Sequence, residues 1–323
     1  MTPSSPSRLY ETAAIPRPRT TAERLRFKPM GLDDIPVLRR FLPLGGVRTC
    51  DFTIGGLMMW AEYFSYSYAI LEDTLFVKGV TEDDVTRPAF SFPVGPMPLG
   101  RAVRVLKDYC RANGAMPLTF SAVPEEKVAA LRALGAAETT LLEDWQDYLY
   151  SAEALATLTG KKLSKKRNHV NRFMAEHPDR ELTPISQDNI EAVKEFYHAC
   201  RLPLSKPALA DIERQQVLDV LDHLESYPFE GAVLTVGPDR RIVAFAIGEV
   251  AADTLYVHIE KMDHSVSGAG ETINKMFAEL MCRRHREIAC INREEDTGDP
   301  GLRAAKESYH PMAMLRKYNV TML

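Results

Sequence analysis

The chain has 323 residues, of which 45% are apolar and 26% charged, and its formal net charge is −4. This length allows two domains of ordinary size, and the composition is that of a folded protein. The small negative charge excludes a protein whose whole surface binds nucleic acid, so any binding of nucleic acid has to be local. No stretch approaches the roughly 18 apolar residues that span a bilayer. The five cysteines are scattered without a CxxC pair, so we expect a cytoplasmic protein without a disulfide framework or a metal site.

The N-terminal residues are rich in Pro, Ser, Thr and Arg and contain no apolar core. This composition excludes a signal peptide and predicts a disordered leader over residues 1–23.

A weak internal repeat organises the rest of the chain. Phe27-Lys28-Pro29 is followed by Asp33-Asp34-Ile35, and Leu182-Thr183-Pro184 is followed by Asp188-Asn189-Ile190. Both runs predict a short strand ending at Pro, an Asp that caps a helix, and apolar residues at helical spacing. We therefore expect a duplication, with a first domain over residues 24–150, a basic linker helix over 151–179 and a second domain over 180–323.

The second copy shows a clear alternation of elements. Strands are expected over residues 232–236, 241–250, 254–261 and 288–292, and helices over residues 271–286 and 299–308. The first copy is less clear: strands are expected near residues 67–77, 89–93, 117–121 and 141–150, with a helix near residues 99–113.

A glycine loop opens the predicted helix of the second copy. Gly268 and Gly270 lie between a strand and a helix N-terminus, where free N–H groups and the helix dipole favour an anion. The order of elements resembles the acyl-CoA N-acyltransferase (GNAT-like) superfold, whose loop reads Gln/Arg-x-x-Gly-x-Gly/Ala. Ser265 stands here in place of Gln or Arg, so the alternative that the glycines serve only a tight turn stays open.

Two longer stretches resemble one family. They are Lys161-Lys162 with Lys165-Lys166-Arg167-Asn168-His169, and the run from Asn292-Arg293-Glu294-Glu295-Asp296 to Lys306 and Tyr309. Over roughly residues 24–321 the chain resembles the C-terminal domain of phosphatidylglycerol lysyltransferase. The resemblance implies an α+β fold of two tandem GNAT-like domains, with mixed, mostly antiparallel sheets flanked by helices.

The resemblance also implies an activity. Characterised members move an aminoacyl group from a charged tRNA to the headgroup of phosphatidylglycerol. Those enzymes carry a membrane-spanning portion, and this sequence has no integral membrane segment. The acceptor therefore stays open between a lipid headgroup and a small amine or hydroxyl compound, as does peripheral contact with a membrane.

On a helical projection, the basic run has two faces. Lys161, Lys165 and Arg172 form a stripe opposite the apolar arc, which suits phosphate or simply solvent. Lys166 falls inside the apolar arc, where an unpaired ammonium is costly, so we expect it to point inward or into a cleft. Arg167 lies at the edge of the apolar arc and could reach the same cleft. Asn168 is a candidate only because of the resemblance to the family.

The basic run would form one wall of a site. We expect the polar run from Asn292 to Asp296 to form the opposite wall, because ligands collect beyond the carboxyl ends of strands. A capped loop is the alternative. The alternating pattern of the strand before the glycine loop predicts that Glu260 shares a sheet face with Tyr256 and His258. Lys306 and Tyr309 share a helix face.

These expectations define one candidate site. The catalytic candidates are Glu260, Arg293, Glu294 and Asp296. The substrate-binding candidates are Lys165, Lys166, Arg167, Asn168, Gly268, Gly270, Asn292, Lys306 and Tyr309. A carboxylate would accept a proton or hold an α-ammonium, and a cation would stabilise an oxyanion or hold phosphate. We expect the basic segment, the glycine loop and the run after the strand to border one cleft.

Three functions remain open from the sequence. The first is an acyltransferase that uses aminoacyl-tRNA as donor, without a certain cofactor. The second is an N-acyltransferase that uses acyl-CoA, and the third is a binding module without turnover.

Overall fold

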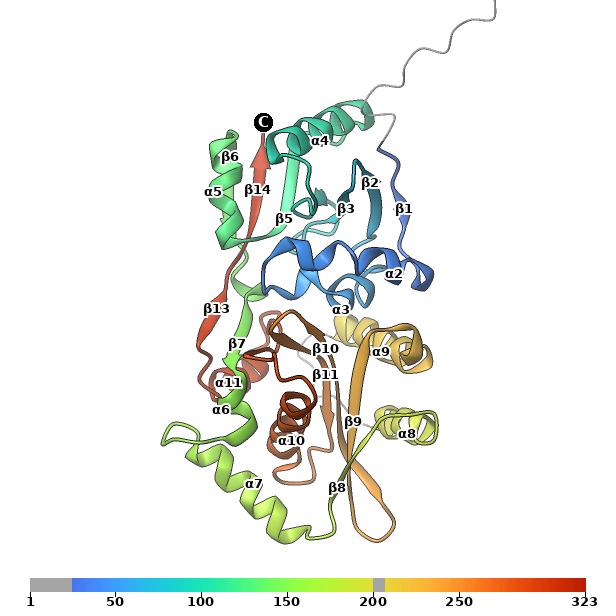
Figure 1. Cartoon of the computed structure of the whole chain (residues 1–323), viewed down its shortest axis with the longest axis vertical. Helices are drawn as coiled ribbons and strands as arrows, with labels where there is room; N and C mark the ends of the chain where they lie inside the picture. Colours follow the sequence, from blue (N-terminus) through green and yellow to red (C-terminus); the bar gives the residue numbers. More distant parts are fainter. Residues whose placement is uncertain (1–24, 200–206) are drawn as a thin grey trace, which may run out of the picture.

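The computed structural model describes residues 25–199 and 207–323, which form two seven-stranded sheets one above the other along the longest axis (Figure 1). The first sheet has the order β1 (Lys28–Pro29), β2 (Ser67–Leu71), β3 (Thr74–Val80), β4 (Pro88–Phe90), β5 (Leu118–Pro124), β14 (Lys317–Met322) and β6 (Ala136–Leu141). The second has the order β8 (Glu181–Pro184), β9 (Phe229–Val236), β10 (Arg241–Ala251), β11 (Thr254–Met262), β12 (Cys290–Asn292), β7 (Asp147–Ser151) and β13 (Ala313–Leu315).

The two sheets have the same strand order and the same strand directions. In each, the fourth and fifth strands are parallel, as β4 with β5 and β11 with β12, and all other neighbours are antiparallel. A long helix joins the parallel pair in each sheet, α4 (Leu99–Asn113) in the first and α10 (Ala269–Arg284) in the second. The predicted duplication and the tandem GNAT-like α+β fold are therefore confirmed.

One strand of each sheet comes from the other part of the chain. β7 lies between β12 and β13 in the second sheet, and β14 lies between β5 and β6 in the first. The expected first domain, residues 24–150, thus contributes most of β7 to the second sheet, and residues 180–323 contribute β14 to the first. The expected leader, residues 1–23, lies outside the described residues.

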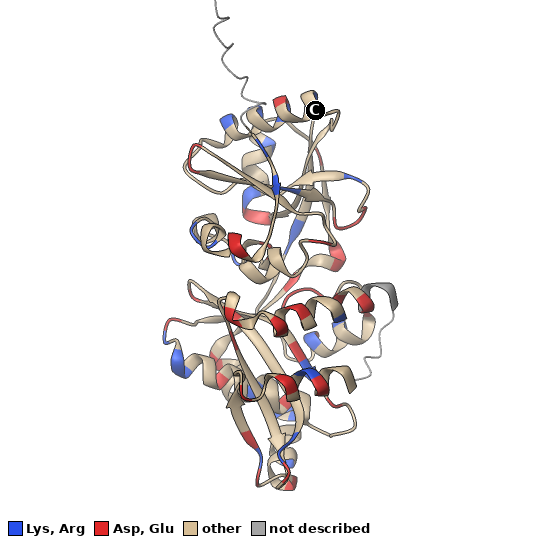
Figure 2. Cartoon of the chain, turned by 90° about the vertical axis from the view of Figure 1, so that its right-hand side faces the viewer, with Lys and Arg blue, Asp and Glu red and all other residues tan. Residues whose placement is uncertain are grey.

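The remaining helices cover the sheets. They are α2 (Ile35–Leu38), α3 (Ile54–Met58), α5 (Glu125–Ala133), α6 (Ala152–Thr157), α7 (Ser164–Glu176), α8 (Ile190–Ala199), α9 (Pro207–Asp222) and α11 (Pro300–Glu307). Short 3₁₀ turns are η1 (Leu32–Asp34), η2 (Leu42–Gly45), η3 (Cys50–Phe52), η4 (Glu143–Trp145) and η5 (Leu224–Ser226). Acidic and basic residues are interspersed over both parts in the view of Figure 2.

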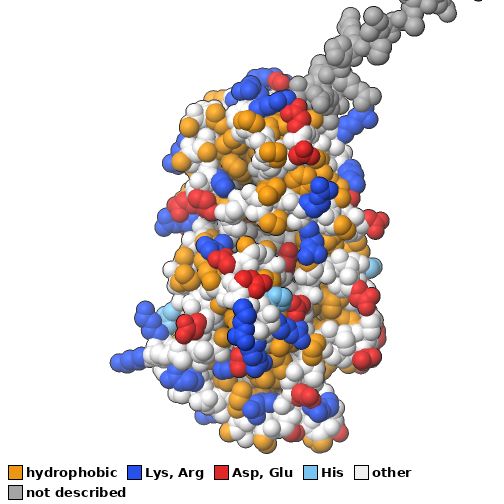
Figure 3. All heavy atoms as spheres, viewed as in Figure 1, with side chains coloured by type: hydrophobic (Ala, Val, Ile, Leu, Met, Phe, Trp, Pro, Cys, Tyr) orange, Lys and Arg blue, Asp and Glu red, His pale blue; other side chains and the backbone are white. Residues whose placement is uncertain are grey.

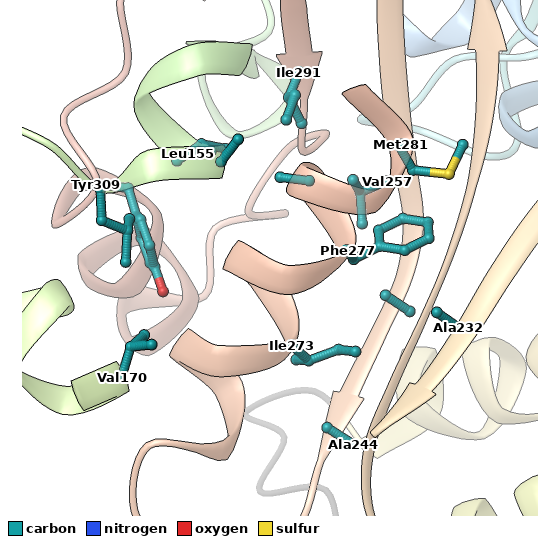
Figure 4. Packing of buried hydrophobic residues seen from close by; sticks show 14 of the residues in the cluster. Leu155, Val170, Ala232, Ala244, Val257, Ile273, Phe277, Met281, Ile291 and Tyr309 are labelled. Atoms are coloured by element: carbon teal, nitrogen blue, oxygen red, sulfur yellow. The ribbon is translucent and has the colours of Figure 1, made fainter. Parts of the chain in front are cut away.

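The core that positions the site lies between α10 and the second sheet. Ile273, Phe277 and Met281 recur at helical spacing along α10 and pack toward Ala232 and Val257 of the sheet (Figure 4). α6 and α7 add Leu155 and Val170 to the same cluster (Figure 4). The other face of this sheet shares a second apolar cluster with the first sheet, to which Leu75 and Phe245 both belong. The two sheets are thus joined by a common core.

Two expected strands are not continuous. Residues 67–77 form the hairpin of β2 and β3, because Glu72 and Asp73 both have left-handed backbone, with φ 50° and 53°, as a tight two-residue turn requires. Residues 141–150 divide into the end of β6, η4 and β7, which belong to different sheets. Apolar alternation does not reveal these reversals.

Candidate functional site

The site is built around the guanidinium of Arg293, which directly follows β12. One of its nitrogens, Nη2, donates to Glu260 Oε1 on β11 at 2.9 Å, and the group lies 4.9 Å from the ring centroid of Tyr309. The second oxygen of Glu260 accepts from Asn274 Nδ2 on α10 at 3.1 Å. Although burial disfavours its charge, Glu260 raises the pKa of Arg293, so the guanidinium stays protonated.

The basic helix α7 reaches the same place. Lys166 Nζ lies 4.4 Å from the ring centroid of Tyr309 and 3.4 Å from Glu271 Oε1, and its side chain is 17% exposed. The inward direction predicted for Lys166 from the helical projection is confirmed. We call Lys166, Glu260, Glu271, Asn274, Arg293 and Tyr309 the Arg293 cluster. It draws side chains from α7, β11, α10, the loop after β12 and the turn after α11.

Two buried atoms of the Arg293 cluster have no hydrogen-bond partner within the described part of the chain: Arg293 Nη1 and Asn274 Oδ1. They belong to the two side chains that flank Glu260, and one is a charged donor while the other is an acceptor. A buried polar group without a partner costs about 1–3 kcal/mol. A ligand that supplies an acceptor and a donor side by side would recover this energy.

The glycine loop contributes mainly through packing. Gly268 has φ 82°, and a Cβ there would lie 2.9 Å from the carbonyl oxygen of His169, so glycine allows α7 to approach the start of α10. A Cβ on Gly270 would meet Met262 at 3.0 Å. The contact between α7 and α10 is what brings Lys166 to Glu271.

The other polar residues of the run after β12 point away from the Arg293 cluster. Asp296 accepts from Tyr148 Oη at 2.6 Å and from Arg303 Nε at 2.8 Å, and Arg303 lowers the pKa of its carboxyl despite burial. Asn292 Nδ2 donates to Asp147 at 2.8 Å. These two residues therefore anchor the loop, as the alternative of a capped loop proposed.

Lys306 also holds the loop rather than joining the cluster. Its buried ammonium donates to the carbonyl oxygens of Arg293 at 2.6 Å and Glu294 at 3.2 Å, and to that of Glu295. Burial lowers the pKa of Lys306. The shared helix face predicted for Lys306 and Tyr309 is not found, because α11 ends at Glu307; Lys306 holds the loop, and Tyr309 lies beside Arg293.

The predicted common face is wrong for Glu260 because β11 contains a β-bulge, whereas Tyr256 and His258 do share a face, with ring centroids 6.4 Å apart. Ile247 pairs with Ile259 but Gly248 pairs with Val257, so His258 is an extra residue. The bulge reverses the alternation. Glu260 contacts α10, whereas His258 lies on the opposite face, where its ring centroid is 5.1 Å from that of Phe229. The Glu294 side chain lies on the same face as His258, and its Oε1 is 2.6 Å from His258 Nδ1.

The outer residues of the basic run form an exposed stripe. Lys161, Lys165 and Arg172 are exposed, as is Asn168, and Figure 3 shows Lys and Arg side chains gathered at the lower left, where Figure 1 places α6 and α7. Arg167 instead turns back and donates to the carbonyl oxygens of Leu158 at 2.6 Å and Gly160 at 3.2 Å. Its role here is to shape the α6–α7 connection.

The sequence did not reveal a second buried charge cluster, around Lys317 at the start of β14. Its ammonium lies 2.7 Å from Asp147, 2.9 Å from Asp51 and 3.6 Å from Glu295. Cys50, Asp147 and Glu295 are close enough to ligate a metal, but the Lys317 ammonium, 3.3 Å from the Cys50 sulfur, lies among them. The available signal was weak, because Asp51 and Asp147 are far from Lys317 in the sequence.

A cleft of about 1050 Å³ lies elsewhere, between the first sheet and α9. Its lining includes Lys78, Phe90, Tyr109 and Gln216, and none of the candidate site residues. The chemistry expected from the sequence therefore centres on the Arg293 cluster and not on this cleft.

The duplicated fold, with one strand exchanged in each direction, defines a tandem GNAT-like protein. The chain matches the family model "Phosphatidylglycerol lysyltransferase, C-terminal" over residues 45–321 and belongs to that family.

Solved structures share the fold of this chain. A conserved protein of unknown function from Bacteroides thetaiotaomicron is 31% identical, with a TM-score of 0.82 and coverage of 93% of this chain and 100% of that one. L-PGS from Bacillus licheniformis is 14% identical, with a TM-score of 0.61 and coverage of 91% and 92%, and it shows a similar fold. FemX is 9% identical, with a TM-score of 0.60 and coverage of 93% and 98%, and it also shares the fold.

An uncharacterized protein of Mycoplasmoides gallisepticum is 21% identical over 182 residues, which are 56% of this chain and 58% of the relative. The match thus spans little more than half of that relative. Within the described residues, no helix is long and apolar enough to cross a membrane.

Proposed function

We propose that the protein transfers an aminoacyl group from a charged tRNA to an amine or hydroxyl of an acceptor, at the Arg293 cluster. The observation that carries the proposal is the pair of unpartnered buried atoms beside Glu260, Arg293 Nη1 and Asn274 Oδ1. Family membership supports the reaction class. An aminoacyl ester offers a carbonyl oxygen as acceptor and an adjacent α-ammonium as donor, which are the two groups that these atoms lack.

The residues have separate tasks in this proposal. Arg293 Nη1 hydrogen-bonds the ester carbonyl oxygen and stabilises the negative charge that develops on it. Glu260 and Asn274 Oδ1 hold the α-ammonium. The acceptor attacks the carbonyl carbon, its bond to that carbon forms, and the ester bond to the tRNA ribose breaks.

The proton released by the acceptor ends on the departing ribose oxygen. Glu260 and Glu271 are the carboxylates of the Arg293 cluster that could carry it, and burial raises the pKa of the Tyr309 phenol, which therefore remains protonated as a donor. The exposed stripe of Lys161, Lys165 and Arg172 supplies a local surface for tRNA phosphates. A lipid headgroup and a small amine or hydroxyl compound remain the acceptor classes to be compared.

Acyl-CoA is the second candidate donor. The observation in its favour is the position of Gly268 and Gly270 at the N-terminus of the 16-residue helix α10, next to the parallel strands β11 and β12. In this alternative, the pyrophosphate would bind at the helix N-terminus, and an α-ammonium would be unnecessary.

A donor screen tests the proposal. Purified protein is incubated with a set of radiolabelled aminoacyl-tRNAs, and separately with acyl-CoAs, in the presence of lipid vesicles containing phosphatidylglycerol or of a small-molecule extract. We expect label to move from an aminoacyl-tRNA to an acceptor, and Arg293→Lys to slow this transfer because Lys lacks the second N–H arm. Transfer from acyl-CoA alone would contradict the proposal.

A further inference from the structure

The peptide after Arg293 has a backbone conformation that is unusual for its residue type. Glu294 has φ 57°, in the left-handed region that non-glycine residues rarely adopt. Its N–H donates to Asn292 Oδ1 at 2.7 Å, and its carbonyl oxygen accepts from Tyr148 N at 3.2 Å. Such strain persists where the surroundings hold it in place. Arg293 and Glu294 point to opposite faces of the second sheet, the first to Glu260 and the second to His258.

On its own face, the Glu294 carboxylate meets a buried histidine. His258 has a side chain that is 1% exposed, with Nδ1 2.6 Å from Glu294 Oε1 and Nε2 3.3 Å from Glu249 Oε2. Both ring nitrogens therefore face carboxylates, which only accept hydrogen bonds, so the ring serves both when it is doubly protonated. Burial lowers the pKa of His258, but Glu294 and Glu249 outweigh burial and raise it to about 9.

The chain of contacts continues into the first part of the molecule. Glu249 Oε1 and Oε2 accept from the backbone N–H groups of Ile54 at 3.2 Å and Gly55 at 3.0 Å, in the first turn of α3. A Cβ on Gly55 would lie 2.2 Å from His258 Nε2. There is thus no free space between α3 and the imidazole, and any shift of one has to move the other.

We propose that His258 is a positioning residue, which transmits the placement of α3 through Glu249 and Glu294 to Arg293 and so sets the direction of the guanidinium in the Arg293 cluster. This inference rests on the proposed function for its effect on turnover. His258 touches neither the Arg293 cluster nor any reacting atom, because the second sheet lies between them. Its influence passes through the single peptide unit that joins Arg293 to Glu294.

His258→Gln tests the proposal, because glutamine keeps a polar side chain but cannot donate to Glu249 and Glu294 from opposite sides with a positive charge. We expect kcat for transfer to fall roughly tenfold to a hundredfold, as for other small misplacements of a catalytic group. KM for the charged tRNA should change little, since the exposed stripe of Lys161, Lys165 and Arg172 is untouched.

Gly55→Ala tests the same connection from the other end. The added methyl group displaces His258 without altering any titratable group, and we expect it to reproduce the fall in kcat. His285→Gln is the matched control. His285 also lies between two carboxylates, Glu230 and Glu287, but at the far end of α10. It should leave kcat unchanged.

The pH profile of the unaltered protein gives a readout that needs no substitution. The groups facing the imidazole are Glu249 from β10, Glu294 from the loop, the Phe229 ring from β9, the Tyr256 ring from β11 and the first turn of α3. Because the folded pKa is raised, the charge is complete at neutral pH and is lost as pH rises through about 9. The transfer rate of the unaltered protein should decline over that pH range, and the rate of His258→Gln should not.

A measurement without turnover separates this inference from the proposed function. The ¹⁵N–¹H resonance of Arg293 Nε should shift in His258→Gln and in Gly55→Ala, and remain in place in His285→Gln. An unmoved resonance in folded His258→Gln, or unchanged kcat with an unaltered alkaline decline, would overturn the positioning role. A moved resonance in a protein that transfers nothing from any aminoacyl-tRNA would overturn the proposed function alone.

Discussion

Arg293→Ala is expected to damage both stability and turnover. Arg293 and Glu260 have side chains that are 12% and 13% exposed and are joined at 2.9 Å. Removing one partner of a buried pair leaves the other charge uncompensated and costs about 3–5 kcal/mol, and the slight exposure here places the loss near about 3 kcal/mol. For a protein of this size, with an unfolding entropy of about 2.1 cal/mol/K per residue, the thermal midpoint should fall by about 4 °C.

The effect on turnover has a different origin. The charged hydrogen bond from Arg293 to the donor carbonyl is worth about 1.5–3 kcal/mol, so the transfer rate should fall about tenfold to a hundredfold. The double variant Arg293→Ala with Glu260→Gln removes the stranded charge. We expect it to recover most of the lost stability and none of the activity.

Thermal unfolding followed by circular dichroism, together with the transfer assay, measures the two effects. Arg303→Ala is a useful comparison, because Arg303 pairs with Asp296 outside the Arg293 cluster and is 41% exposed. A melting temperature of Arg293→Ala equal to that of the unaltered protein would refute the reasoning, as would a double variant that regains activity.

Three further predictions follow from other contacts. Replacing Lys161, Lys165 and Arg172 by Glu should weaken tRNA binding and flatten its salt dependence in gel-shift titrations, whereas replacing Arg101, Arg104 and Arg111 of α4 should not; equal affinities would argue against the basic stripe. Burial raises the pKa of Glu82 to about 7, so the folded protein favours the protonated carboxyl of this residue. The stability that Glu82 contributes to the protein is therefore lost as pH rises from about 4.5 through 7. Glu82→Gln should therefore raise the melting temperature at pH 8 but not at pH 4, and a gain at both would contradict this. Lys317→Met should cost about 3–5 kcal/mol in denaturant unfolding, because three carboxylates lose their buried cation, while exposed Lys162→Met should cost nearly nothing.

The sequence predicted what depends on local periodicity. The azimuth of Lys166 within an apolar arc correctly predicted that its side chain points inward, and the strand-Pro-Asp-helix pattern correctly indicated the duplication. The chemistry of the run after β12 was predicted only in part. Arg293 lies at the cluster, but the carboxylate of Asp296 and the ammonium of Lys306 are used to fix the loop, and residue type alone does not distinguish these uses.

Two features were beyond sequence reasoning for physical reasons. The bulge at His258 reverses the faces of β11, and a single extra residue leaves no mark in an alternating pattern. Lys317 meets Asp147 across 170 positions of sequence, and nothing near either residue indicates the other. Both features arise from the packing of one part of the molecule against the other.

The strand exchange has a consequence for synthesis on the ribosome. Chains are made from the N-terminus, and domains ordinarily fold as they emerge. Here the first sheet has β5 and β6 on either side of a position that only Lys317–Met322 fills. Until that segment is made, the inner edges of β5 and β6 expose unpaired backbone groups, which invite pairing with other chains. The first sheet therefore cannot be completed until Lys317–Met322 has been made.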